Sequence, residues 1–267
     1  MNTDTKETLT AADYFAIERM SNSKLKLFRT NRRKFFLQHV AKTLPPDEPS
    51  EAMQLGTLLH CLLLEPDEYA SRYAVAPACD RRTKEGKATW QEFCQQSNGK
   101  QVVKAEMREQ AARMADAVLT SPLAAPFILD MPGQVEHSIL WECDGVPCKS
   151  RLDKLCPDVI VDIKTAKDAS PEAFARAAAN LSYNSQAAFY RRAAGVSQFI
   201  FLVVENVEPY RVACFDLDRE ALDYGDAANL LALRNYTHAL ETGQWSDDFE
   251  RRVTTLSLPR WSFSEDA

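Results

Sequence analysis

The sequence lacks the features that mark membrane proteins and secreted proteins. No run of residues approaches the roughly 18 uninterrupted apolar residues that a helix needs to cross a bilayer. The polar N-terminus, residues 1–8, has no apolar stretch of the kind found in a signal peptide. Internal repeats and low-complexity tracts are absent as well. We therefore expect no membrane partner and an intracellular, cytoplasmic location.

The sequence also lacks the cysteine patterns of disulfide-rich and metal-binding domains. Its seven cysteines are odd in number and include no C-x-x-C pair. Secreted scaffolds pair their cysteines, whereas zinc knuckles and iron–sulfur sites need a coherent set of about four ligands. We therefore expect neither a disulfide framework nor a zinc or iron–sulfur site.

Acidic residues are missing from residues 19–43, although the whole chain has a formal net charge of −6 at pH 7. That segment holds eight lysines and arginines, whereas residues 215–250 carry nine Asp or Glu against two Arg. Such asymmetry is typical of a protein with one DNA-facing surface and an acidic outer face, and a merely solvated basic helix is the alternative. The candidate DNA-binding residues lie in this segment and in residues 77–100: Lys24, Arg29, Arg32, Arg33, Lys34, Arg81 and Arg82.

The order of the expected elements predicts an α/β fold. Helix caps, proline breakers and apolar periodicity predict helices over residues 21–40, 51–64 and 104–120, with a loop and a short helix in 77–100. Alternation and turn signals at Asp144-Gly145 and Pro157-Asp158 then predict strands over 135–142, 146–155 and 159–163. A helix over 171–194, strands over 198–205 and 210–216, and an acidic helix over about 218–242 complete the chain. We expect a small mixed β-sheet sandwiched between helices.

The length of 267 residues is enough for one large domain. We expect a disordered tail over residues 1–12 and a single domain over 13–267. Its parts are a helical, DNA-binding part (13–130), the sheet core (131–216), and a C-terminal helix and tail (217–267). Residues 256–261 of that tail are expected to pack irregularly on the body.

The apolar strand predicted over residues 159–163 contains one acid, Asp162, and is followed directly by Lys164. Because side chains alternate along a strand, Asp162 and Lys164 share one face, while Val161 and Ile163 point the other way into a core. Burying an unpaired carboxylate costs several kcal/mol or forces it to take up a proton. Nine residues earlier another strand carries Asp153. A divalent metal with oxygen ligands, held between Asp153 and Asp162, is the simplest source of the positive charge required.

The same D/E-x-K spacing has a trivial interpretation elsewhere in the chain. It also occurs at residues 4–6 and 85–87, in polar segments where we attach no meaning to it. For Asp162 and Lys164 the alternative to a metal site is a surface salt bridge at a sheet edge.

Three further side chains are candidates for the same site. His60 is the only ionisable residue in an apolar helical stretch, and Gly56, one turn earlier, leaves room for a backbone or a ligand to approach. A neutral imidazole beside carboxylates can ligate a metal, although a lone His on an apolar face is more often a core residue. Gln186 and Tyr190 are four residues apart on a predicted helix, so they share a face and could contact a phosphate or orient Lys164.

Taken together, five motifs in this order resemble the RecB-type branch of the PD-(D/E)XK nucleases. They are G-T-L-L-H followed by L-E-P, then R-L-D, V-D-I-K-T, Q-A-A-F-Y, and L-S-L-P-R-W in the tail. The resemblance is closer to the RecE-type exonucleases, the exodeoxyribonuclease VIII group, which are related to lambda-type exonucleases. It extends from about Ser21 to the tail and implies a restriction-endonuclease-like core, a mixed sheet flanked by helices.

The resemblance also implies a role for each motif residue. His60, Asp153, Asp162 and the Ile163 carbonyl would ligate metal, and Lys164 would position the attacking water and stabilise the developing phosphorane charge. Gln186 and Tyr190 would orient Lys164 and the scissile phosphate. Glu136 matches a recurrent acid of the family whose role the sequence does not define. Ala166 follows Thr165 where the family often has a second Thr, and no catalytic role depends on it.

The activity that the resemblance implies is 5′→3′ digestion of one strand of linear duplex DNA to mononucleotides. Such a nuclease would use one or two Mg²⁺ ions, or Mn²⁺ in their place, and would leave 3′ single-stranded tails for a RecT-like strand-annealing recombinase. A homo-oligomeric ring, a trimer or a tetramer, would close around the duplex. Two alternatives remain open at this point: a RecB-like endonuclease or nuclease subunit of a larger complex, and a non-catalytic DNA-end-binding scaffold.

Overall fold

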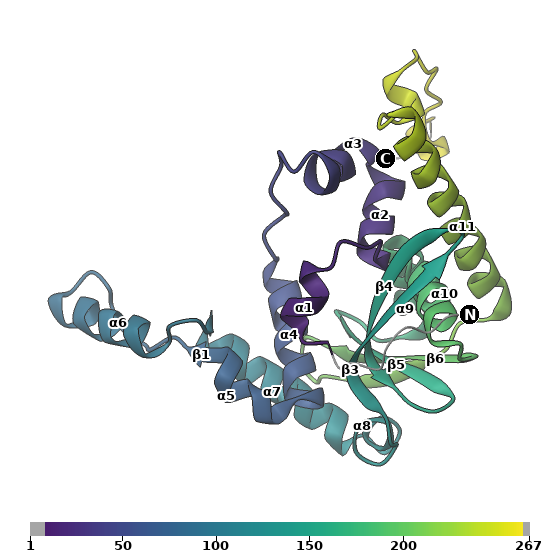
Figure 1. The fold of residues 1–267 in the computed structure, drawn as a ribbon. Coiled ribbons are helices and arrows are strands. Elements are labelled where there is room, and N and C mark those ends of the chain that lie inside the picture. The colour runs from purple at the N-terminus through teal and green to yellow at the C-terminus, as the bar shows by residue number, and fades with distance from the viewer. Residues whose placement is uncertain (1–8, 264–267) are drawn as a thin grey trace.

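A five-stranded mixed sheet forms the centre of the computed structural model, which describes residues 9–263 (Figure 1). The strand order is β3-β4-β5-β6-β7, with β3 to β5 antiparallel, β6 parallel to β5, and β7 antiparallel to β6. The strands are β3 (Gln134–Cys143), β4 (Val146–Leu155), β5 (Val159–Ala166), β6 (Gln198–Glu205) and β7 (Val212–Phe215). The strand predictions are therefore confirmed to within a few residues, and the mixed α/β fold is confirmed with them.

The turn between β3 and β4 sets the register of the sheet. Asp144 and Gly145 both have positive φ, 53° and 75°, as a two-residue type I′ hairpin requires. Cys143 therefore pairs with Val146, and the pairing continues down both strands to Gln134 and Leu155.

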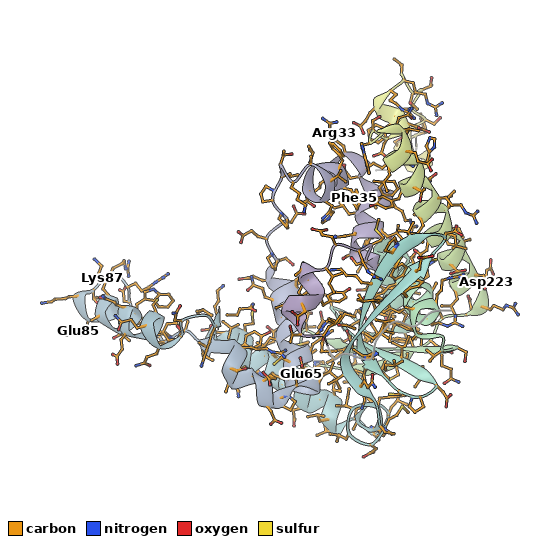
Figure 2. All side chains as sticks on the ribbon, in the orientation of Figure 1. Arg33, Phe35, Glu65, Glu85, Lys87 and Asp223 are labelled. Carbon is orange, nitrogen blue, oxygen red and sulfur yellow. The ribbon has the colours of Figure 1, made fainter. Side chains whose placement is uncertain are left out.

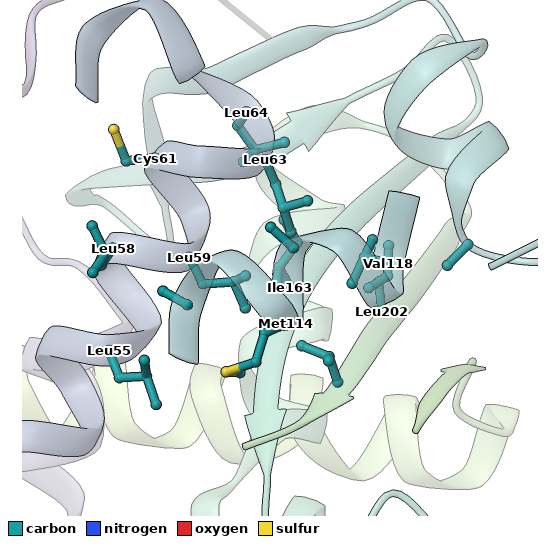
Figure 3. Close-up of a cluster of buried hydrophobic side chains, with 14 of the residues drawn as sticks. Leu55, Leu58, Leu59, Cys61, Leu63, Leu64, Met114, Val118, Ile163 and Leu202 are labelled. Atoms are coloured by element: carbon teal, nitrogen blue, oxygen red, sulfur yellow. The ribbon is translucent and has the colours of Figure 1, made fainter. Parts of the chain in front are cut away.

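Each face of the sheet buries a separate apolar core. Val161 and Ile163 pack with Leu59 of α4 (Glu51–Leu64) and Met114 of α7 (Ala105–Thr120), as Figure 3 shows for several of these side chains. On the other side, residues of β5 and β6 pack against α9 (Pro171–Leu181) and α10 (Tyr183–Ala194). Ile160 belongs to this second core, so the alternation predicted for β5 is correct.

A third core joins the N-terminal helices to the long C-terminal helix α11 (Arg219–Thr242). Phe28 and Phe35 lie edge to face, with ring centroids 5.3 Å apart, and Trp245 stacks on Phe35 at 6.2 Å. Such aromatic contacts hold the basic segment to the body. Helix α11 packs on α10 along the outside of the molecule (Figure 1).

Two of the predicted helices are broken in the structure. Residues 21–40 form α2 (Asn22–Thr30), α3 (Arg32–Phe35) and a π-helical turn (Phe36–Val40), because Asn31 leaves the helical conformation and caps α3. Residues 171–194 form α9 and α10, because Ser182 adopts a left-handed φ of 57° between them. Both breaks were missed because asparagine and serine also occur in helix interiors.

The segment predicted as a loop and a short helix is an arm that projects from the body (Figure 1). Its helix α6 (Lys84–Gln96) has 13 residues and is longer than expected. A parallel pair that the sequence did not reveal, β1 (Tyr73–Val75) and β2 (Gln101–Val103), closes the base of the arm. The remaining short helices are α1 (Ala11–Ala16), α5 (Tyr69–Arg72), α8 (Ala125–Leu129) and the 3₁₀ turns Pro66–Glu68, Asp248–Glu250 and Arg260–Phe263.

The two ends of the chain differ from expectation. Thr10 caps α1, so residues 11 and 12 of the predicted disordered tail are helical, and residues 1–8 lie outside the described residues. In the C-terminal tail Val253, Leu256 and Leu258 are exposed, so the predicted packing of this segment on the body is wrong for the described residues.

Charged side chains cover the surface of the arm and of α11 (Figure 2). Within residues 9–263, no helix has the length and apolar character needed to span a membrane.

Candidate active site

The site forms where β4 and β5 separate. Only two residue pairs link these strands, Lys154 with Val161 and Leu155 with Ile160. Beyond them the side chain of Asp153 takes the place of the ladder, because its Oδ2 accepts a hydrogen bond of 2.7 Å from the Ile163 amide. The gap between the strands is therefore held by a carboxylate and not by backbone pairing.

Helix α4 and strand β3 bring two more potential ligands to Asp153. The His60 Nδ1 atom lies 3.6 Å from Asp153 Oδ2 and 4.0 Å from Glu136 Oε1. Its Nε2 atom is 3.1 Å from the Ile163 carbonyl oxygen. One ligand atom from each of His60, Glu136 and Asp153 can be chosen so that all three lie within 4.8 Å of one another. The alternative that His60 merely fills the core does not match these contacts, since both ring nitrogens face oxygen atoms.

Gly56 contributes less to this arrangement than the sequence indicated. A Cβ atom at Gly56 would meet nothing within 4 Å, so neither a backbone segment nor a side chain approaches it closely in the described residues. The groove expected beside it is open space. His60 is positioned by the register of α4 against β5 and needs no glycine contact.

Glu136 is the site residue whose role sequence analysis left undefined. It lies directly across from Asp153, between the pairs Val135–Lys154 and His137–Leu152. Its φ of 48° is a conformation that few non-glycine residues adopt, and such strain clusters at functional sites. Arg151 holds the side chain in place, with Nε 2.7 Å from Glu136 Oε2.

The carboxylates repel one another and are poorly solvated. Burial raises the pKa of Glu136, and the neighbouring Asp153 charge raises it further. The Arg151 and His60 side chains lower this pKa, but by less. Burial likewise raises the pKa of Asp153; His60 opposes this shift and Asp162 adds to it. A bound cation would reverse both shifts, because nearby positive charge favours the ionised form of a carboxyl group.

On the other side of the strand gap lies a carboxylate–ammonium pair. The Asp162 side chain, 1% exposed, forms an ion pair with the Lys164 ammonium through Oδ2 and accepts a 3.1 Å hydrogen bond from Gln186 Nε2 through Oδ1. Burial alone would lower the pKa of Lys164, but the charges of Asp162 and Asp153 outweigh it and raise that pKa. Lys164 therefore stays an ammonium ion within the site.

The two candidates on α10 lie next to this pair. Gln186 contacts Asp162 and not Lys164, so the predicted orienting contact to the lysine is indirect. Burial raises the pKa of Tyr190 well above its usual value, and the Asp162 charge adds to this, so the hydroxyl remains protonated. Tyr183, which sequence analysis missed, lies under Lys164, whose ammonium is 5.0 Å from the ring centroid.

The donor set fits a divalent cation. Two carboxylates, one imidazole and a backbone carbonyl are the oxygen and nitrogen ligands that Mg²⁺ and Mn²⁺ accept. Among the described residues, Arg151 forms an ion pair with Glu136, and the Lys164 charge acts on Asp153, but neither carboxylate is buried with a full set of donors. The cluster can therefore hold a metal. The roles of His60, Asp153, Asp162 and the Ile163 carbonyl as metal ligands stay predictions.

The predicted DNA-binding residues are spread over two regions. On α2, Arg29 donates a 2.7 Å hydrogen bond to Ser185 of α10, and Lys26 donates one of 2.8 Å to the Leu181 carbonyl. Burial lowers the pKa of Lys26, and the charges of Lys164 and Arg29 lower it further. Lys26 was not among the residues that the sequence singled out.

The other basic residues have mixed surroundings. Lys24, Arg32 and Lys34 form ion pairs with Glu18, Asp247 and Asp47, at 3.2, 3.5 and 2.6 Å respectively. Arg33 is exposed and makes no ion pair with the described residues. On the arm, Arg81 lies over the Trp90 ring at 4.4 Å and Arg82 pairs with Asp80 at 3.0 Å, so these two act away from the strand gap.

Comparison with known proteins agrees with the fold and the motifs. Residues 21–251 match the family described as "PDDEXK-like domain of unknown function (DUF3799)". No curated protein sequence is similar enough to count as a match.

Two solved structures are similar in fold. A candidate exonuclease from Eubacterium rectale superposes with a TM-score of 0.62 at 15% identity, over 98% of this chain and all of that one. LHK-Exo in complex with dAMP has a TM-score of 0.43 at 12% identity, over 86% of this chain and 95% of that one. LHK-Exo is described as an alkaline exonuclease from Laribacter hongkongensis.

The resemblance to PD-(D/E)XK nucleases is thus confirmed by a family match over most of the sequence and by a full-length likeness in fold. The chain belongs to the PDDEXK-like family DUF3799.

Proposed function

We propose that this protein is a metal-dependent exonuclease that digests one strand of linear duplex DNA in the 5′→3′ direction. One observation carries the proposal: His60, Glu136, Asp153, Asp162 and Lys164 converge on the gap between β4 and β5. Three acids and an ammonium around one space are suited to hydrolysis of a phosphodiester. The likeness to the Eubacterium rectale protein supports the choice of an exonuclease.

The metal would be Mg²⁺, or Mn²⁺ in its place, with one or two ions per site. His60, Glu136 and Asp153 would hold it, and Asp162 and the Ile163 carbonyl would complete the set. When bound, such ions neutralise the phosphodiester and lower the pKa of a coordinated water.

The protein's own groups would do the rest. The Lys164 ammonium would position the attacking water and stabilise the charge that develops on the phosphorus oxygens. Gln186 would hold the Asp162 carboxylate in its orientation, through the 3.1 Å hydrogen bond already present. Tyr190, protonated at neutral pH, would donate a hydrogen bond to the scissile phosphate.

DNA would approach along α2. Lys26 and Arg29 contact Leu181 and Ser185 around the start of α10, the helix that carries Gln186 and Tyr190. Arg33 is exposed on the next helix, so a duplex end there would meet positive charge. The acidic helix α11 would face outward. Lys24, Arg32 and Lys34, and Arg81 and Arg82 on the arm, would add contacts to the DNA backbone.

The products would be mononucleotides and 3′ single-stranded tails, which a RecT-like annealing recombinase would take up for homologous recombination. A closed ring of three or four copies would hold the duplex and make digestion processive. We also propose that residues 13–267 act as a single nuclease domain in the cytoplasm.

A gel assay tests this proposal. Linear duplex DNA labelled at either end, and the same DNA as a covalently closed circle, are incubated with Mg²⁺ or with EDTA. We expect loss of the linear DNA only with Mg²⁺, early release of the 5′ label as a mononucleotide, and intact circles. Nicked circles would favour the endonuclease, and binding of ends without any cleavage would favour the scaffold. A mass near one chain in light scattering would exclude the ring.

A further inference from the structure

A groove of about 800 Å³ lies between α1, the start of α2 and the loop that follows the π-helical turn. Its walls combine apolar and cationic side chains, among them Phe15, Lys24, Lys42, Pro45 and Lys149. A second cavity of about 550 Å³ shares Glu18, Lys24, His39 and Lys42 with it. The two cavities are therefore lobes on either side of the same four side chains.

One wall carries an exposed aromatic ring. Phe15 is 74% exposed and packs edge to face on the buried Tyr14, with centroids 5.5 Å apart. Holding an apolar ring in water contributes nothing to folding, so the ring is available to a ligand. The opposite wall is fixed by Gln38, whose amide donates a 3.0 Å hydrogen bond to the Pro45 carbonyl. The π-helical turn that contains Gln38 is a feature often found at functional sites.

The floor of the groove is a buried cation. Lys149 is 3% exposed and donates hydrogen bonds of 2.6 and 2.8 Å to the carbonyls of Tyr14 and Ile17. No carboxylate pairs with it among the described residues. It therefore fixes α1 to the sheet and leaves positive charge beneath the groove.

The groove is connected to the active site along β4. Lys149 and Arg151 are two residues apart on this strand and so point to the same face. Arg151 contacts Glu136 of the metal-binding cluster, and its charge also acts on Tyr14. Four residues of a strand span about 13 Å, so a DNA strand a few nucleotides long could reach from Lys149 to Asp153.

At the rim, Glu18 bridges two lysines. Its carboxylate oxygens lie 3.2 Å from Lys24 Nζ and 3.1 Å from Lys42 Nζ, and its side chain is 64% exposed. Exposed ion pairs of this kind contribute little and are easily replaced. A phosphate group has the charge and the oxygen atoms to take the place of this carboxylate.

We propose that this groove binds single-stranded DNA next to the scissile phosphate, with one base stacked on Phe15 and its phosphate between Lys24 and Lys42. Glu18 occupies the phosphate position when DNA is absent and thus weakens binding. The inference rests on the proposed function for the identity of the strand, but the groove can be tested without cleavage.

The test measures fluorescence anisotropy of a labelled oligothymidylate of about 12 nucleotides in EDTA, which prevents metal-dependent cleavage. We expect Phe15→Ala to weaken binding by about tenfold, the scale of losing one base–aromatic stack, and Phe15→Trp to restore it. Lys42→Ala should weaken binding and lower the slope of log affinity against log salt by about 0.7, the value of one phosphate contact to a single strand. Glu18→Gln should strengthen binding by about threefold.

Tyr224→Ala is the matched control, because Tyr224 is a 70% exposed aromatic residue on α11. It should leave the affinity unchanged. Equal losses of affinity in Phe15→Ala and Tyr224→Ala, or weaker binding by Glu18→Gln, would contradict the proposal that the groove binds DNA. Wild-type protein that fails to degrade linear duplex DNA but shows the expected order of affinities would overturn the proposed function and leave the groove standing.

Discussion

Two carboxylate sites on the central sheet, one at the end of β6 and the other at the gap between β4 and β5, have different surroundings. Glu205 at the end of β6 is 2% exposed, accepts a 2.8 Å hydrogen bond from the Ala169 amide, and lies 2.7 Å from the Arg211 guanidinium. Hydrogen bonds from Arg211 hold the pKa of Glu205 below its usual value. In the β4–β5 gap, by contrast, burial raises the pKa values of Asp153 and Glu136.

The difference shows how to tell a structural carboxylate from a functional one. A carboxylate with a complete set of donors stabilises the fold and has nothing left to offer a ligand. The cluster at His60, Glu136 and Asp153 keeps unneutralised negative charge, which disfavours the folded state unless a cation binds.

The largest effect is expected on catalysis at the strand gap. Asp162→Asn should lower the rate of metal-dependent cleavage by about 10³-fold, and Lys164→Ala by about 10²- to 10³-fold, because each removes a charged group from the reacting centre. DNA affinity in EDTA should persist in both. Asp158→Asn, in the exposed turn before β5, is the control. Cleavage by either variant at the wild-type rate would exclude this gap as the active site.

A smaller effect is expected when a candidate ligand is lost. His60→Ala should raise the Mg²⁺ or Mn²⁺ concentration needed for half-maximal activity by about tenfold or more, since even loss of an outer partner of a metal site costs about that much. Its melting temperature in EDTA should change little. The exposed His238 offers the control His238→Ala. A large loss of stability with unchanged metal dependence would instead identify His60 as a core residue.

At the structural carboxylate Glu205, loss of its partner Arg211 should affect the stability of the fold and not catalysis. Arg211→Ala should lower the melting temperature by a few degrees at neutral pH without changing the metal dependence of cleavage. Because the pKa of Glu205 is lower in the folded than in the unfolded state, its stabilisation is present above about pH 4.3 and is lost as the pH falls through the folded-state pKa. Wild type and variant should therefore converge in stability as the pH falls through that folded-state pKa.

Arg219→Ala removes an exposed i,i+4 pair with Asp223 and serves as the control for this experiment. It should not change the melting temperature at any pH in this range. A loss in Arg211→Ala that stays undiminished as the pH is lowered until the wild type unfolds would show that Arg211 acts through packing and not through the Glu205 charge.

The smallest effect is expected on the salt dependence of DNA binding. Arg29→Glu should lower the slope of log affinity against log salt by about 0.9 for the single phosphate contact that it removes from duplex DNA. Arg219→Glu makes the same change of charge on α11 and should leave the slope as it is. Equal slopes in the two variants would mean that α2 does not face DNA.

Much of the site could be predicted from residue order alone. The D-x-K spacing in an apolar strand places Asp162 and Lys164 on one face, and the structure pairs them there. The i,i+4 spacing of Gln186 and Tyr190 placed both on one side of α10. These predictions depend only on the periods of strands and helices, which any chain obeys.

Glu136 could have been identified by counting. The Asp144-Gly145 turn predicts a two-residue hairpin, and counting equal steps back from Cys143 and forward from Val146 brings Glu136 opposite Asp153. The turn and both strands are predicted from the sequence, so the position of Glu136 opposite Asp153 follows from it too. What the count does not show is the strained φ of Glu136 or its contact with Arg151.

The sequence by itself determined the strand meander, the face of β5 that carries the acid and the lysine, and the basic character of the N-terminal segment. Only the tertiary structure decided that His60 meets Asp153 across about 90 residues of chain, that Tyr183 underlies Lys164, and that α1 and the loop at Pro45 enclose a groove. Short-range periodicity follows from backbone geometry, which is local. Contacts between distant segments depend on how whole faces of helices and sheets bury their apolar surface, and no local pattern encodes that packing.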